Sequence, residues 1–182
     1  MFLSKLLSSK RPKRPVLSAL LLAGIAAAAL PMTALAQSLP GFTIFSGVRN
    51  ENQLNYRLDF GGRSDSWDRY RLRISSKRMK LAVSQFVISY PDYYDGKFDT
   101  KDVEIIVRGK SVPIREVRWS QDSFVLEIFP QEPIPAGNDV EIQLSNVKNP
   151  VFGGTYYFNC QILTPGDVPL LRYIGTWIIT IS

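Results

Sequence analysis

The sequence predicts an all-β protein, an antiparallel β-sandwich whose favoured form is immunoglobulin-like. Apolar and polar residues alternate with period two along several segments, as they do in strands that bury one face. Turn-forming Gly, Pro, Asp and Asn residues separate these segments at intervals of about 8–15 residues. No segment has the apolar spacing of a convincing amphipathic helix. Short strands at this spacing, about nine of them, are typical of a sandwich.

Each expected strand carries a row of apolar residues on one face. The first row, over residues 54–60, consists of Leu54, Tyr56, Leu58 and Phe60. The later rows are Val103/Ile105/Val107, Phe124/Leu126/Ile128, Val140/Ile142/Leu144, Tyr156/Phe158/Cys160/Ile162 and Trp177/Ile179/Ile181. Residues 76–86 are ambiguous and allow a helical turn.

Turn signals fall between these rows. They are Gly61-Gly62, Asp95-Gly96, Arg108-Gly109, Gln121-Asp122, the sequence PAG at 135–137, Gly153-Gly154 and Pro165-Gly166. Pro150 and the glycine pair that follows it predict a hairpin connection between a strand ending near Val147 and one starting at Thr155.

Residues 1–36 predict a cleaved secretory signal peptide. Five cations and no acid lie in this stretch, a 15-residue apolar run spans 16–30, and the small-residue pattern TALA ends at Ala36. A transmembrane helix is the alternative, but it needs about 20 apolar residues. No Arg-Arg pair precedes the run, so we expect the general secretion route. Residues 37–182 are then a single β-sandwich domain without a second membrane-length apolar segment.

Composition excludes several classes of function. The chain of 182 residues has a net charge of +6, but residues 37–182 hold 17 of the 22 Lys and Arg against all 16 Asp and Glu. This balance gives no support for nucleic-acid binding. The absence of His removes Ser-His-Asp and Cys-His catalysis and His-ligated metals. Cys160 is the only thiol, so no intramolecular disulfide can form, and its inward position predicts an inert, buried side chain. No cofactor motif is found.

A basic segment is the first candidate binding surface. Its cations are Arg69, Arg71, Arg73, Lys77, Arg78 and Lys80. On a strand, the first three share one face at spacings of about 6.6 Å. Such a row could grip phosphates, sulfates or uronic acids of an envelope polymer. It could equally be a solvated face whose charges prevent edge-to-edge aggregation.

The segment 90–102 supports two further hypotheses, each with a structural alternative. Its acidic residues, weak candidates for calcium ligands, are Asp92, Asp95, Asp99 and Asp102. Their spacing does not match a calcium-binding loop, so a structural turn is the default. Its aromatic residues are Tyr90, Tyr93, Tyr94 and Phe98. They could stack on sugar rings or plug one end of the core.

The sequence contains no complete catalytic motif that we recognise. Ser145 and Lys148 match the Ser-x-x-Lys pattern of penicillin-interacting enzymes, but the companion Ser-Asp-Asn and Lys-Thr-Gly elements are absent. The sequence therefore predicts a protein that is not an enzyme.

Several stretches together resemble a cyanobacterial family of exported proteins known only as a domain of unknown function. They are LPGFTIF at 39–45, SYPDYYDGKF at 89–98, PAG at 135–137, LSNVKNP at 144–150 and YIGTW at 173–177. The resemblance implies a secreted β-rich domain in or outside the cell envelope, with no catalytic residues to transfer. It leaves open the periplasm, the outer envelope, the extracellular space and the thylakoid lumen.

We therefore expect an exported, non-catalytic binding or structural module of the cell envelope that contacts an anionic polymer through the basic strand face. One alternative is an accessory subunit that docks on another exported protein. A more distant alternative is a small cell-wall hydrolase.

Overall fold

Two packed β-sheets form the fold, as the alternating apolar rows predict. The computed structural model describes residues 47–166 and 170–182, which belong to one compact unit, Leu39–Ser182. The predicted signal peptide lies outside the described residues. In the described part of the chain, the only helical element is a 3-10 turn, Asn50–Asn52, and no helix is long and apolar enough to cross a membrane.

The first sheet has the strand order β1-β11-β10-β4-β8-β7. Its strands are β1 (Gln53–Leu54), β4 (Gln85–Ser89), β7 (Ile114–Ser120), β8 (Val125–Pro130), β10 (Gly154–Leu163) and β11 (Leu171–Ile181). All neighbours in it are antiparallel except β1 and β11, which pair in parallel.

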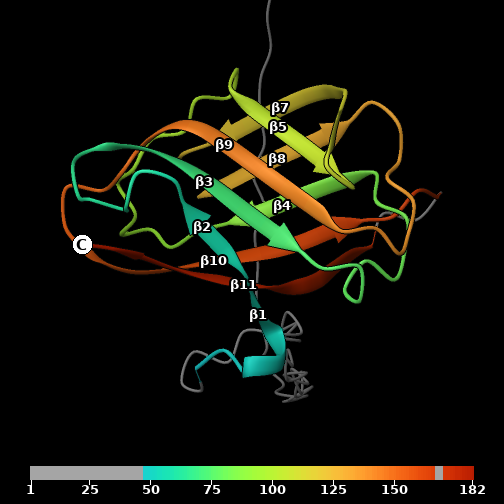
Figure 1. The fold of residues 1–182 in the computed structure, drawn as a ribbon, viewed down its shortest axis with the longest axis horizontal. Helices are drawn as coiled ribbons and strands as arrows, with labels where there is room; N and C mark the ends of the chain where they lie inside the picture. Colours follow the sequence, from blue (N-terminus) through green and yellow to red (C-terminus); the bar gives the residue numbers. More distant parts are fainter. Residues whose placement is uncertain (1–46, 167–169) are drawn as a thin grey trace, which may run out of the picture. The chain divides into compact units, whose positions relative to one another are not determined.

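The second sheet has the order β2-β3-β9-β5-β6 and is antiparallel throughout. Its strands are β2 (Tyr56–Leu58), β3 (Trp67–Ile74), β5 (Val103–Val107), β6 (Lys110–Val112) and β9 (Val140–Lys148). Figure 1 shows this sheet lying across the first one. The two layers confirm the predicted antiparallel β-sandwich.

The core lies between the inward rows of the two sheets. Its largest fully buried side chains include Trp177, Tyr70, Phe86 and Phe158. The predicted rows on β5, β8, β9, β10 and β11 supply about half of the remaining core residues, so alternation alone located much of the core. Cys160 is fully buried among them, as predicted, and burial raises the pKa of its thiol far above the ordinary value.

Two predicted connections differ from the structure. The row at 54–60 is not one strand, because the chain crosses from the first sheet to the second at Asn55, and Phe60 is 62% exposed. The turn after Lys148 exists, but it joins β9 of the second sheet to β10 of the first, so it is an arch between layers and not a hairpin. Alternation marks the buried face of a strand but does not say which sheet contains it.

The ambiguous segment 76–86 is a turn followed by the start of β4. The Met79 N–H donates to the carbonyls of Ser75 and Ser76, which closes a single turn. The helix does not continue beyond Met79, and the chain then becomes extended. By contrast, the Arg108-Gly109 turn is a true hairpin between β5 and β6. Both residues have positive φ, 50° and 78°, as a two-residue primed turn requires.

Candidate binding face

The arginines of β3 lie on the outer face of the second sheet. Tyr70, Leu72 and Ile74 point into the core and are at most 1% exposed, so Arg69, Arg71 and Arg73 must point outward. We call these three, together with Arg57, Asp59 and Glu141, the arginine face. The period of the strand places the row as the sequence predicts.

Two carboxylates from neighbouring strands divide the arginine row into ion pairs. Asp59 follows β2, and its carboxylate lies 2.7 Å from the Arg57 guanidinium and 2.8 Å from that of Arg71. Glu141 on β9 lies 2.8 Å from both Arg71 and Arg73. Arg69 is 3.7 Å from Asp59 and also donates from Nε to Ser145 Oγ. Arg71 is therefore the bridge between the two carboxylates.

The carboxylates respond to two opposing effects. Burial alone would raise the pKa of Asp59, but hydrogen bonds from Arg57 and Arg71 outweigh it, so the pKa lies below 3.8. In the same way, burial raises the pKa of Glu141, whereas hydrogen bonds from Arg73 and Arg71 lower it below 4.5. Both carboxyl groups are therefore charged at neutral pH, so every contact between them and the arginines is an ion pair.

Exposure separates the arginines into two kinds. The Arg71 side chain is 23% exposed and is held by both carboxylates. The side chains of Arg69, Arg73 and Arg57 are 37%, 50% and 60% exposed. Four guanidinium groups share two carboxylates, so positive charge remains on the face after the pairs have formed. Arg57, Arg69 and Arg73 can present N–H donors to a partner, and Arg71 has a structural role.

The remaining cations of the predicted stripe lie beyond β3, in the segment that leads to β4. Lys77 and Lys80 are exposed and form no ion pair in the described part of the chain. Arg78 is half-buried and donates to the Ile174 carbonyl at 3.3 Å. These three residues do not continue the row on the sheet, because the chain turns away after Ile74.

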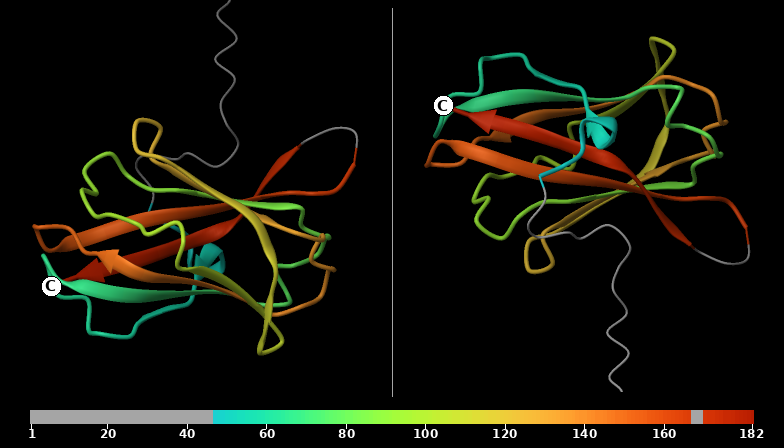
Figure 2. Two further views of the ribbon diagram at one scale, coloured as in Figure 1. Left: turned by 90° about the horizontal axis from the view of Figure 1, so that it is seen from above. Right: turned by 90° about the horizontal axis from the view of Figure 1, so that it is seen from below.

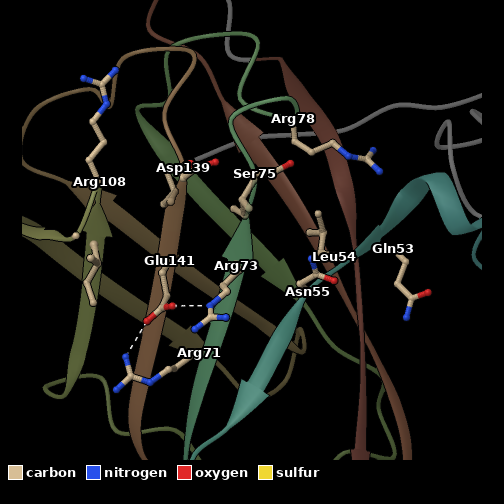
Figure 3. Close-up of a pocket in the computed structure, with 14 residues that line it drawn as sticks. Gln53, Leu54, Asn55, Arg71, Arg73, Ser75, Arg78, Arg108, Asp139 and Glu141 are labelled. Carbon is tan, nitrogen blue, oxygen red and sulfur yellow. Dashed lines mark hydrogen bonds and ion pairs between the residues drawn. The ribbon is translucent and has the colours of Figure 1, made fainter.

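An open cavity of about 680 Å³ adjoins the end of the arginine face where β3 finishes. Four arginines line it, namely Arg71, Arg73, Arg78 and Arg108, together with the acids Asp139 and Glu141. Figure 3 shows dashed lines joining Arg71 and Arg73 to Glu141, while Arg78 and Arg108 extend in different directions. Asp139 is engaged by the Ser76 N–H at 2.7 Å. The cavity therefore places two further arginines, Arg78 and Arg108, next to the arginine face.

Sequence reasoning did not identify the partners of the row. Glu141 was visible as an outward residue of its strand, and Arg57 and Asp59 as outward residues of theirs. Their pairing depends on strand register: Arg57 faces Arg71, and Glu141 faces Arg73. The register between two strands cannot be deduced from the sequence of either strand alone.

The aromatic residues of segment 90–102 lie mostly inside the molecule. Tyr90, Tyr94 and Phe98 are at most 6% exposed, and all three rings pack against Phe158. Tyr90 meets Tyr94 and Phe98 edge-on, whereas Tyr94 and Phe98 are stacked. Their burial matches the core-plug alternative and removes their faces from contact with a sugar. Tyr93 is different, with 59% of its surface exposed.

A buried polar chain fixes this plug to the β9–β10 arch. The Tyr70 hydroxyl lies 2.6 Å from Asn149 Oδ1 and 3.2 Å from the Tyr94 hydroxyl. Asn149 Nδ2 donates to the Arg63 carbonyl at 2.8 Å. Burial raises the pKa of Tyr70 and of Tyr94 far above the ordinary tyrosine value, so both hydroxyls stay neutral donors. Two of the stretches behind the family resemblance, 89–98 and 144–150, therefore meet here.

The acidic residues of the same segment serve as acceptors within loops. Asp95 accepts from the Val151 N–H, Asp99 from the Lys101 N–H, and Asp102 from the Asn146 side chain. Asp92 is exposed. Within residues 47–166 and 170–182, no three His, Cys, Asp or Glu residues lie close enough together to hold a metal ion. The structure does not gather the four candidate calcium ligands.

The fold and the face define a class: a β-sandwich domain with an ion-paired, arginine-rich outer sheet face. More particularly, the chain belongs to the family described as protein of unknown function (DUF2808), whose model matches residues 42–181. No curated protein matches it.

Among solved structures, the chain is similar to BslA, described as a bacterial hydrophobin, with 15% identity, a TM-score of 0.41, and coverage of 68% of this chain and 97% of that one. It is similar to the collagen-binding domain of a Staphylococcus aureus adhesin, with 10% identity, a TM-score of 0.41, and coverage of 70% and 95%. It is also similar to an uncharacterised Nocardia farcinica protein described as having an immunoglobulin-like fold, with 7% identity, a TM-score of 0.39, and coverage of 71% and 98%.

Proposed function

We propose that the chain is an exported, non-catalytic binding module of the cell envelope that contacts an anionic polymer through the arginine face. The observation that carries this proposal is the surplus of guanidinium groups: four arginines share the carboxylates of Asp59 and Glu141, and three of them remain more than a third exposed. The proposal that the protein is exported rests on the signal-peptide pattern of residues 1–36.

The geometry suits a polymer better than a small ligand. The row lies on an open sheet face, where successive arginines are about 6.6 Å apart, and the cavity that Arg71 and Arg73 line at its end is open to solvent and does not enclose the row. Guanidinium groups pair with carboxylate, sulfate and phosphate in a two-pronged manner, so repeating anionic groups along a chain can engage several arginines at once. The carboxylates of Asp59 and Glu141 restrict the rotamers of the arginines, so less side-chain conformational entropy is lost when a polymer binds.

Binding to polymer-coated beads tests the proposal. Residues 37–182, which contain the whole compact unit, are mixed with beads carrying polygalacturonate, dextran sulfate or neutral dextran. We expect binding to at least one charged polymer, none to neutral dextran, and loss of binding at about 1 M salt, where exposed charges are screened beyond about 3 Å.

The decisive variant changes Arg57, Arg69 and Arg73 to Gln and leaves Arg71 in place, so that the structural bridge is kept. Binding should then fall at least tenfold. The matched control changes three exposed cations outside the face, Lys101, Arg115 and Arg172, to Gln. It should bind as the parent does. Equal losses in both variants would mean that net charge, and not the arginine face, drives the interaction.

A further inference from the structure

Exposed apolar side chains gather at one end of the sandwich. Nine large hydrophobic residues are exposed in the part of the chain that the structure describes; four of them come from three neighbouring connections, and a fifth is the first residue of β3. We call these five the apolar tip: Phe60, Trp67, Tyr93, Val151 and Phe152. Phe152 is the most exposed of all, at 76%, and Phe60 and Trp67 are each exposed by 62%.

Hydrogen bonds from backbone N–H groups to backbone carbonyls and to one carboxylate hold the three connections together beside the C-terminus. The Asp65 N–H donates to the Pro150 carbonyl at 2.8 Å, and the Ser64 N–H donates to the Ser182 carbonyl at 2.8 Å. The Val151 N–H donates to Asp95 Oδ1 at 3.2 Å. Figure 2 shows the loops around residues 60–66, 91–98 and 149–153 at the end that carries the C label. The tip is therefore one surface built from distant segments.

The tip rests on a rigid base. The Tyr93 ring lies 5.6 Å from the Tyr156 ring, and the Tyr156 hydroxyl donates to the Phe152 carbonyl at 2.7 Å. Tyr156 is buried and packs in turn on Tyr94 of the core plug. Little further ordering is needed when the tip contacts a partner, so burial of its apolar area is not offset by a large loss of conformational entropy.

The charges around the tip argue against an anionic partner. Apart from Asp59, which belongs to the arginine face, the connections 59–66, 91–102 and 149–153 carry Asp65, Asp92, Asp95, Asp99 and Asp102 against Arg63, Lys97 and Lys101, and Lys148 at the end of β9 adds a fourth cation. This balance is opposite to that of the arginine face. Attraction at this end must come from apolar burial, which salt does not screen.

The shape of the tip favours a surface over a groove-binding ligand. Neither of the cavities at the far end, beside Arg108 and beside Pro135, reaches the tip. Phe152 and Val151 carry no polar group, whereas Trp67 and Tyr93 have an apolar ring with one polar atom. Trp and Tyr side chains favour the boundary between water and lipid, whereas purely apolar side chains such as those of Phe152 and Val151 favour the acyl region below it.

We propose that the apolar tip inserts into the interface of an uncharged or zwitterionic lipid surface. The Lys148 ammonium, 5.9 Å from the centre of the Trp67 ring, lies beside this inserting ring, where a long cationic side chain can extend into the headgroup layer. This inference does not depend on the proposed function, because it concerns a different surface.

Flotation with vesicles of pure phosphatidylcholine tests the proposal. Residues 37–182 should float with the vesicles at low salt and at about 1 M salt alike, because the contact is apolar. Trp67 emission should shift to shorter wavelength on binding, and Trp67→Phe should remove that shift, which separates it from the signals of Trp119 and the buried Trp177.

The double variant Trp67→Ser/Phe152→Ser should reduce the floated fraction at least tenfold. Its matched control is Leu81→Ser/Leu171→Ser, which removes two exposed apolar side chains at the other end of the strands. The triple arginine variant should still float, and the tip variant should still bind charged beads, so failure of one proposal is distinguishable from failure of the other.

Several results would overturn lipid insertion. They are an absence of flotation, equal losses in the tip and control variants, and binding restricted to anionic vesicles at low salt, which would assign the contact to the arginine face. A concentration-dependent dimer in sedimentation velocity without vesicles, abolished by the tip variant, would assign the tip to a second copy of the chain.

Discussion

Asp68 is the most buried acidic or basic residue in the part of the chain that the structure describes. It is 1% exposed, and its carboxylate accepts hydrogen bonds from the backbone N–H groups of Phe60, Gly62 and Arg69 at 2.7–2.9 Å. A carboxylate that accepts three amide hydrogen bonds fixes the turn between β2 and β3 and so sets where Asp59 meets the arginine row.

We predict that Asp68→Ala destabilises the protein by about 3 kcal/mol, because it leaves three backbone donors without their acceptor. Urea unfolding followed by tryptophan fluorescence measures the change. Asp68→Asn, which keeps one acceptor oxygen, should cost less, and Asp92→Ala on an exposed loop should cost almost nothing. Equal stability of the Ala variant and the parent would contradict this role.

The ion pairs of the arginine face predict a pH dependence. Asp59 and Glu141 have lowered pKa values in the folded protein, so their contribution is fully present above the unfolded values of 3.8 and 4.5. It is lost as the pH falls through the folded values. The free energy of unfolding of the parent should exceed that of Glu141→Gln by about 1 kcal/mol at pH 7, a modest amount because water screens the pairs.

This difference should stay constant from pH 7 to about pH 5 and close as the pH falls further. Urea unfolding at a series of pH values gives the measurement. Glu104→Gln on the neighbouring strand, where no ion pair forms among the described residues, is the control and should show no such closure. A difference that persists unchanged at pH 2 would exclude the ion pairs as its source.

At the same scale, the sequence predicts single residues well when their environment follows from alternation. The burial of Cys160 and the outward direction of Arg69, Arg71 and Arg73 are of this kind. The partners Asp59 and Glu141 are not, because each meets the row only through pairing with another strand. The exposure of Phe60 was also mispredicted, because the turn that follows β2 carries it off the core.

Among the elements, β1 depends on a close approach that only glycine allows. Gly175 on β11 lies beneath β1, and a Cβ built on it would meet the Asn52 carbonyl oxygen at 2.6 Å and Leu54 Cγ at 2.8 Å. Leu54 belongs to β1, which pairs in parallel with β11, and Asn52 ends the 3-10 turn directly before it. The glycine of the YIGTW stretch therefore leaves room for the segment that leads into the neighbouring strand β1.

We predict that Gly175→Ala displaces β1 and destabilises the protein by about 1–3 kcal/mol, the usual cost of overpacking. Hydrogen exchange should show lost protection at residues 53–54 and 176–177, with the remainder of the sandwich retained. Gly47→Ala is the control, since nothing lies within 4 Å of its Cβ position. Unchanged protection at β1 would show that the close approach is not required.

Strands and turns were predictable where the turn-forming residues and the apolar alternation agree. The β5–β6 hairpin at Arg108-Gly109 and the turn after Lys148 appear where the sequence places them. Their sheet membership was not predictable, because an arch and a hairpin use the same Pro and Gly residues. The split of 54–60 into β1 and β2 has the same origin, since both halves alternate in phase.

For the whole molecule, Cys160 is a probe of global unfolding. It is fully buried at the centre of β10, between β4 and β11, so no local opening of an edge exposes it. Its pKa is raised by burial, which further suppresses the reactive thiolate in the folded state.

We predict that a thiol reagent at pH 8 does not label the native protein on the time scale of a free cysteine. Labelling should appear in urea with the same midpoint as the loss of tryptophan fluorescence. Mass spectrometry of quenched samples measures the labelled fraction. Labelling that precedes the fluorescence transition would reveal an opening of the core short of complete unfolding.

The parallel pairing of β1 with β11 also has a mechanical consequence. The chain enters the sandwich through β1 and leaves it through β11, and the two strands run in the same direction. A pull on both ends of the domain therefore drags these strands past each other lengthwise. The two residue pairs of this short ladder, Gln53 with Thr176 and Leu54 with Trp177, are then loaded together in shear instead of opening one at a time.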